Sequence, residues 1–135
     1  MTFVTIGQLA ALTQVKVPTI RFYEQIGLLQ PMRTQGQQRR YDADSIKRLR
    51  FIRHARNLGF DVDEIKALIN LAGTPDASCK TIETLARLHV EQIDLKLRQL
   101  RAMRRELIAM IESCHGPRVR NCRILEALAK NASGI

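Results

Sequence analysis

The feature that most constrains the fold is a long segment, Cys79 to Glu112, that contains neither glycine nor proline. Apolar residues form a stripe along it that repeats every seven residues, at Ala86, Val90, Ile93, Leu97, Leu100, Leu107 and Ile111. Charged and polar residues fill most other positions, and Arg104 interrupts the stripe once, beside Met103. This pattern predicts one long helix whose narrow apolar seam is covered by a coiled-coil partner.

The alternative is a helix that packs its seam on its own domain. The best boundary in the chain lies at Gly73 to Asp76, so the folded unit before the helix is short. A unit of that size is too small to cover the apolar seam. We therefore predict self-association. The expected parts are a compact unit at residues 1–73, a dimerisation helix at 79–112, and a loop with a short C-terminal helix at 113–135.

The first 30 residues predict two short helices. Thr5 suits the N-cap of the first helix, and Pro18 suits the first turn of the second, where a missing N–H leaves no bond unmade. Gly27 is expected to end the second helix. Two helices joined by a tight connection are typical of a helix-turn-helix.

The helical pattern fails between Leu28 and Tyr41, where Pro31 and Gly36 predict a short hairpin with Gly36 in its turn. Helices resume over Asp42 to Asn57. A further helix follows, with Asp61 and Glu64 as a capping-box pair. The predicted fold is mainly α: a winged helix-turn-helix unit followed by a long helix.

The formal net charge of +9 and the pI of about 10.2 favour an anionic partner, either nucleic acid or a membrane surface. The basic residues gather on predicted helices, most densely at Lys47, Arg48, Arg50, Arg53 and Arg56. Membrane binding is not favoured, because no helix combines a broad apolar face with a basic one. The chain also shows no apolar run of bilayer length and no secretory signal, so we expect a cytoplasmic location.

Several motifs closely resemble the MerR family of metal-responsive transcription regulators, and together they cover nearly the whole chain in order. They are Thr5–Ala10, Thr19–Glu24, Gly27–Leu29, Arg33–Gly36, Arg39–Tyr41, Arg48–Leu49, Phe51–Arg53, Leu58–Phe60 and Glu64–Ile65. One departure is Gln37–Gln38, where many relatives carry glycine or an aromatic residue. That departure affects the packing expected inside the wing but not its basic character.

The resemblance implies a homodimer joined by an antiparallel coiled coil, with one winged helix-turn-helix DNA-binding domain per subunit. Such regulators bind double-stranded promoter DNA and act on RNA polymerase at the promoter. Effector binding changes the dimer so that the DNA is bent and untwisted, a deformation that protein contacts must offset. No nucleophile–base pair or phosphate-binding glycine loop is found, so an enzyme is not expected.

A recognition helix presents side chains to base edges and phosphates from its N-terminal half. The candidates in this chain are Lys16, Thr19, Arg21 and Tyr23. Arg21 is suited to a forked pair of hydrogen bonds to phosphate, and Tyr23 offers one hydroxyl donor. The resemblance adds Arg33, Arg39 and Tyr41 in and beside the wing as contacts to the DNA backbone.

Three cysteines, Cys79, Cys114 and Cys122, are an odd number and do not fit the disulfide framework of a secreted protein. They are either unrelated thiols or ligands, and thiolates select soft or borderline metal ions. Cys114 and Cys122 flank a flexible loop, so their sulfurs can converge on one ion. Cys79 cannot join them within one chain, because one helix from Cys79 to Cys114 is about 50 Å long at ~1.5 Å per residue.

In the antiparallel dimer that the resemblance implies, Cys79 of one subunit lies beside Cys114 and Cys122 of the other. Divalent-metal members of the family carry a cysteine at the head of the dimer helix, whereas copper(I) members usually lack it. A third thiolate also adds negative charge that suits a divalent ion. We therefore expect a cadmium, lead, mercury or zinc ion as effector at a metal-binding loop, with His115 as a possible further ligand.

Three alternatives stay open. One is a copper(I) sensor of the same family, and the second is a sensor of thiol oxidation. An iron–sulfur version of redox sensing is not favoured, because such clusters usually need four cysteines close together. The third is an architectural DNA-binding protein that has no effector at all.

Overall fold

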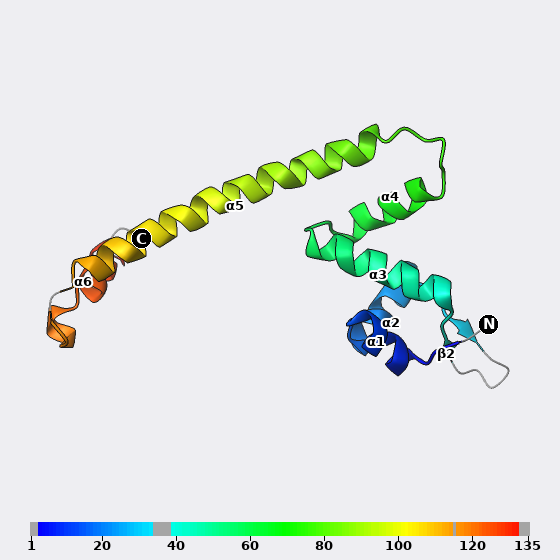
Figure 1. The fold of residues 1–135 in the computed structure, drawn as a ribbon, viewed down its shortest axis with the longest axis horizontal. Helices are drawn as coiled ribbons and strands as arrows, with labels where there is room; N and C mark the ends of the chain where they lie inside the picture. The colour runs from blue at the N-terminus through cyan, green and yellow to red at the C-terminus, as the bar shows by residue number, and fades with distance from the viewer. Residues whose placement is uncertain (1–2, 34–38, 115, 133–135) are drawn as a thin grey trace. The chain divides into compact units, whose positions relative to one another are not determined.

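A computed structural model describes residues 3–33, 39–114 and 116–132 (Figure 1). The chain divides into two compact units, Met1–Leu85 and Ala86–Ile135. Its elements are α1 (Ile6–Thr13), α2 (Val17–Gln25), β1 (Met32–Arg33), β2 (Arg39–Arg40), α3 (Ala43–Asn57), α4 (Val62–Ala72), α5 (Lys80–Glu112), the 3₁₀ turn η1 (Val119–Asn121) and α6 (Arg123–Ala132). This order confirms the predicted mainly helical fold with a small wing.

The helix-turn-helix is built from α1 and α2, and its ends are capped as the sequence predicts. The Thr5 hydroxyl accepts the Gln8 N–H at 3.2 Å, while the Gln8 side chain accepts the Thr5 N–H at 2.8 Å. Pro18 lies in the first turn of α2. Gly27 has a φ of 82°, which a side chain would oppose, and it follows the end of α2.

The wing is an antiparallel pair of two-residue strands in which Met32 lies opposite Arg40 and Arg33 opposite Arg39. The predicted turn residue Gly36 lies outside the described residues. Directly after β2, the backbone of Tyr41 pairs with Val4 through two hydrogen bonds of 2.9 Å. The N-terminal segment is thereby tied to the base of the wing.

The core of the N-terminal unit lies among α1, α2, α3 and α4, where α1 packs against α2 and α3, and α3 against α4. Figure 1 shows these helices gathered together. Its largest fully buried side chains are Leu9, Ile20, Tyr41, Leu49, Ile52 and Ile65. At the start of α3, the Ser45 backbone N–H donates to the Asp42 carboxylate at 2.9 Å, and this bond lowers the pKa of Asp42. The capping box of Asp61 and Glu64 at the start of α4 is also confirmed.

The C-terminal unit holds most of α5, followed by η1 and α6. Among the described residues of α5, Met110 is the one that is buried. Ser113, just after α5, lines a cavity of about 370 Å³ together with Arg123, Glu126, Ala127 and Lys130 of α6. The chain therefore folds back after α5 so that α6 lies near its end (Figure 1).

Candidate functional site

The N-terminal half of α2 presents polar side chains at the surface. Lys16 occupies the N-cap position and is exposed, Thr19 is half-buried, and Arg21 is exposed. Ile20, between the last two, is fully buried and fixes that helix face on the core. The packing of α2 thus leaves Lys16 and Arg21 on the surface, where the sequence analysis expects DNA contacts.

The two tyrosines among the predicted DNA contacts lie in the core. Tyr23 is 7% exposed and Tyr41 is 0% exposed. The Tyr41 hydroxyl donates to the Glu24 carboxylate, which links the base of the wing to α2. The structure therefore corrects the expectation that the Tyr41 side chain faces the DNA backbone, because a fully buried ring offers no atom to a phosphate. Tyr23 leaves only a small part of its side chain at the surface.

The predicted wing contacts, Arg33 and Arg39, lie opposite each other in β1 and β2. Their side chains lie outside the part of the chain whose side chains are described. The backbone places them together on the wing, and their contact with DNA stays a prediction.

A basic cleft lies between the end of α1 and one face of α3. It was not among the predicted DNA contacts. It is lined by Leu12, Thr13, Gln14, Arg50, Arg53, His54 and Asn57. Gln14 forms the turn of the helix-turn-helix in a left-handed conformation, with a φ of 59°. Its side-chain oxygen accepts a hydrogen bond of 3.1 Å from Arg53. The basic residues crowded at 47–56 are the sequence signal for this cleft. The sequence alone does not show which of these arginines lie on the face of α3 next to the turn.

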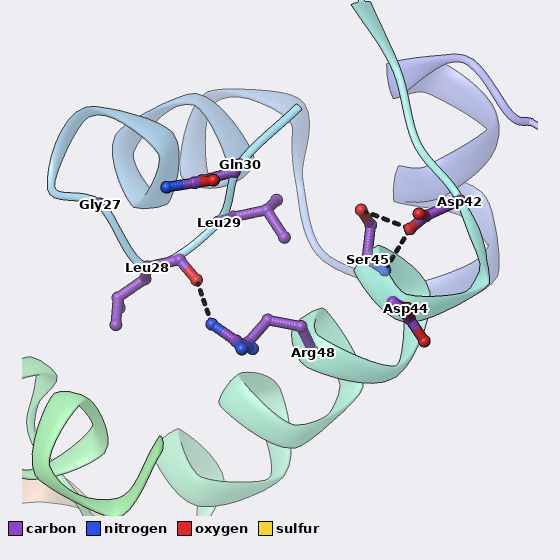
Figure 2. A pocket seen from close by; sticks show the side chains of 8 residues that line it. All are labelled: Gly27, Leu28, Leu29, Gln30, Asp42, Asp44, Ser45 and Arg48. Atoms are coloured by element: carbon purple, nitrogen blue, oxygen red, sulfur yellow. Dashed lines mark hydrogen bonds between the residues drawn. The ribbon is translucent and has the colours of Figure 1, made fainter. Parts of the chain in front are cut away.

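A second polar cavity, of about 370 Å³, lies between the end of α2 and the start of α3 (Figure 2). In it, Arg48 donates to the Leu28 carbonyl oxygen at 3.4 Å. The same cavity contains the Asp42 cap of α3 and its bonds to Ser45. Arg48 thus holds the connection that leads from α2 into the wing, which gives this basic residue a role in the fold.

The three cysteines are free thiols in different surroundings. Cys79 is exposed directly before α5, and its carbonyl oxygen accepts the Glu83 N–H at 3.0 Å. Cys114, just beyond α5, is half-buried and its thiol donates to the Met110 carbonyl at 3.4 Å. Cys122 is also half-buried and directly precedes α6. His115 lies outside the described residues.

Within the described part of the chain, no three His, Cys, Asp or Glu side chains are grouped so that they could hold a metal ion. Cys114 and Cys122 belong to the C-terminal unit, and Cys79 belongs to the N-terminal unit. The 33 residues of α5 lie between the first cysteine and the other two. The donors themselves are thiols, which is the chemistry that soft metal ions prefer.

The predicted seam of α5 is exposed to solvent along its length. The exposed fractions are 55% for Val90, 47% for Ile93, 42% for Leu97, 58% for Leu100, 51% for Leu107 and 60% for Ile111. Cys79 lies seven residues before Ala86, and Cys114 lies seven residues after Leu107. Both thiols therefore continue the seven-residue repeat of the seam at its two ends.

A helix-turn-helix, a two-stranded wing and a strongly basic surface together define a DNA-binding protein of the winged helix-turn-helix class. The chain belongs to the MerR HTH family of regulatory proteins. The family profile described as "MerR HTH family regulatory protein" matches residues 4–71, and a second, described as "MerR, DNA binding", matches residues 46–110. The resemblance seen in the sequence is thereby confirmed, as is the expectation of a DNA-binding transcription regulator rather than an enzyme.

Individual members of the family match nearly the whole chain. The HTH-type transcriptional regulator HmrR of Rhizobium leguminosarum bv. viciae is 35% identical, over 94% of this chain and 98% of that protein. The HTH-type transcriptional regulator ZntR of Escherichia coli (strain K12) is 34% identical, over 96% and 95%. A crystal structure of the transcription regulator PbrR691 from Ralstonia metallidurans CH34 in complex with lead(II) has 39% identity and a TM-score of 0.73, covering 93% of this chain and 98% of that one.

In the part of the chain that the structure describes, no helix is both long and apolar enough to cross a membrane.

Proposed function

We propose that this protein is a homodimeric, metal-responsive transcription regulator that activates metal-resistance and efflux genes by distorting their promoter. The observation that carries the proposal is the placement of three thiols at the two ends of α5, in a chain 39% identical to a regulator solved with lead(II). The effector we propose is a soft divalent ion: cadmium, lead, mercury or zinc.

The proposed DNA interface includes Lys16, Thr19 and Arg21 at the start of α2. It also includes Arg33 and Arg39 of the wing. We add Arg50 and Arg53, because the cleft that they line includes Gln14, two residues before Lys16. Arginines bind phosphate oxygens through paired N–H donors, and such contacts position a protein on the duplex. The hydrogen bond between Arg53 and Gln14 holds one guanidinium at the turn that leads into α2.

The proposed metal site takes Cys79 from one subunit and Cys114 and Cys122 from the other. Pairing two copies of α5 in opposite directions places the head of one helix beside the end of its partner. Because α5 is about 50 Å long at ~1.5 Å per residue, two subunits are needed to bring all three thiols together. His115, which follows Cys114 directly, is a candidate for a fourth ligand.

A site shared between subunits explains how an ion acts on DNA. Each ion bridges the two copies near the start of one α5, which directly follows that copy's DNA-binding unit. Metal binding therefore shifts the arrangement of the two DNA-binding units, and the promoter DNA contacts both of them. RNA polymerase responds to the resulting change in DNA shape, because bending and untwisting realign the elements that it reads.

The test is transcription in vitro from the protein's promoter, with purified protein and each candidate metal added in turn. We expect one or more of the four divalent ions to raise transcript levels. Cys79→Ser should abolish this activation and leave the affinity for promoter DNA unchanged, because the cysteine lies outside the proposed DNA interface. Full induction of Cys79→Ser would refute the shared site.

The other readings predict different results in the same assay. Activation by copper(I) alone would assign the protein to the copper branch of the family. Activation by an oxidant without metal would make it a thiol-redox sensor. Identical transcript levels under every condition would indicate an architectural DNA-binding protein that has no effector.

A further inference from the structure

Charge is distributed unevenly along α5. From Lys80 to Asp94 the helix carries three acidic residues, Glu83, Glu91 and Asp94, and two basic ones, Lys80 and Arg87. From Leu95 to Glu112 it carries five basic residues, Lys96, Arg98, Arg101, Arg104 and Arg105, and two acidic ones, Glu106 and Glu112. The first half is therefore slightly acidic and the second half strongly basic.

One of these charges lies in the seam itself. Arg104 is seven residues after Leu97 and seven before Ile111, so it occupies a position that is apolar elsewhere in the stripe. In coiled coils a single polar residue at such a position weakens the dimer and at the same time selects one arrangement of the two helices. Arg104 is the residue of the seam that can distinguish between orientations.

The two orientations of a pair of α5 helices place this arginine in opposite surroundings. In a parallel, in-register pair, Arg104 of one copy faces Arg104 of the other inside the seam, and the basic halves lie side by side. In an antiparallel pair with matched ends, Arg104 faces the stretch from Ala86 to Ile93 of the second copy. That stretch is apolar in the seam, and the charged residues in and beside it are three acidic ones, Glu83, Glu91 and Asp94, and one arginine, Arg87, with His89 also within it.

We propose that Arg104, together with the unequal charge of the two halves of α5, sets the antiparallel orientation of the dimer. The occupant of the exposed seam is a second copy of this chain, selected by charge complementarity between unlike halves and by repulsion between like halves. This inference rests on the proposed homodimer. It makes Arg104 a positioning residue for the metal site, because only the antiparallel pair brings Cys79 to Cys114.

Native thiols report the orientation. The full chain with Cys122→Ser keeps one cysteine at each end of α5, and a short bis-maleimide links thiols that lie close together. An antiparallel dimer yields the Cys79–Cys114 link between subunits, whereas a parallel dimer yields Cys79–Cys79 and Cys114–Cys114. Peptide mass mapping of the cross-linked dimer band gives the ratio of the two kinds of product.

The parent should give almost only the Cys79–Cys114 link. Arg104→Leu completes the seam, so the dimer should persist while the share of like-to-like links rises about ten-fold or more. Arg104→Lys keeps the charge and should behave as the parent does. Arg105→Leu removes the neighbouring charge outside the seam and serves as the matched control.

Each outcome of the cross-linking experiment tests a different part of the proposal. If Arg104→Leu stays dimeric with the product ratio of the parent, the role of Arg104 is overturned while the homodimer stands. If the parent itself gives mainly like-to-like links, the antiparallel orientation is wrong. If the parent sediments as a monomer and gives no link between subunits, the homodimer of the proposed function fails as well.

Discussion

Tyr41 links the wing to α2 from inside the protein. Its ring is fully buried, its backbone pairs with Val4, and its hydroxyl donates to Glu24 in α2. Glu24 is half-buried, so the bond also supplies a partner to a carboxylate that is partly withdrawn from water. Tyr41 therefore joins the base of the wing to α2 although its side chain is not at the surface.

Replacing Tyr41 with phenylalanine removes the donor to Glu24 and keeps the ring. We expect Tyr41→Phe to lower the free energy of unfolding by about 1–3 kcal/mol, as for other buried bonds to a charged acceptor. Urea denaturation measures this loss. DNA affinity at a temperature where the variant is folded should stay close to that of the parent. A stable variant with weak DNA binding would instead return Tyr41 to the DNA interface.

Arg21 is the exposed arginine of α2, and a phosphate contact would make its effect independent of sequence. Arg21→Ala should weaken binding to operator and random DNA alike, and reduce the slope of log affinity against log salt by about one. Binding titrations at several salt concentrations measure this slope. Lys130→Ala on α6 makes the same change in charge outside the proposed DNA interface and should leave the slope unaltered. An unchanged operator affinity would count against the contact.

The sequence predicts only in part which side of each helix or strand is buried. The residues Thr5, Pro18, Gly27 and Asp61 act through the local backbone, and all four lie at the helix ends where the sequence places them. The burial of Tyr23 and Tyr41 was not predicted, because a tyrosine combines an apolar ring with a polar end and its sequence position does not show which of the two faces the core. Only the packing of α2 and of the wing base on the core resolves that choice.

At the scale of elements, α5 has two apolar stripes rather than one. Leu88 and Leu95, each 50% exposed, are seven residues apart and lie on the side of the helix away from the predicted seam. We do not assign Leu88 and Leu95 to the dimer interface, because their stripe is short and only two alanines, Ala102 and Ala109, continue it. The longer stripe, which ends in a cysteine on both sides, is the one that we assign to the second copy.

The two stripes provide a matched pair of substitutions. Leu100→Asp places a charge in the seam and should weaken the dimer about a hundred-fold or more, since a buried unpaired carboxylate costs several kcal/mol. Leu95→Asp introduces the same charge at a similarly exposed position and should leave the dimer intact. Sedimentation equilibrium of the two variants makes the comparison. Dissociation by Leu95→Asp alone would assign the interface to the opposite face.

At the scale of the whole molecule, the described residues of one chain do not bring together the three thiols of the proposed metal site. The length of α5 is visible in the sequence as a segment without glycine or proline, and it separates Cys79 from the other two thiols. The cysteines alone could be recognised as candidate ligands. Their proposed grouping could not be recognised from the pattern of one chain, because in the proposed site it requires a second copy.

Mixing two inactive variants tests the shared site. Cys79→Ser and Cys114→Ser should each bind metal poorly as homodimers, because both sites of each lack a ligand. A mixed dimer keeps one complete site, built from Cys79 of one copy and Cys114 and Cys122 of the other. After exchange of subunits, we expect metal binding to return at about one ion per mixed dimer, measured by equilibrium dialysis. No recovery after verified exchange would place the site within single chains.

The distance between Cys79 and Cys114 also determines which partner can complete the site. Two copies of one chain always match, because both helices have the same length. A related regulator whose long helix differs by one heptad would shift the two ends by about 10 Å in total at ~1.5 Å per residue. A metal–sulfur bond of about 2.3 Å does not tolerate such an offset. A regulator of this family whose long helix differs by a heptad would therefore not complete a metal site with this chain.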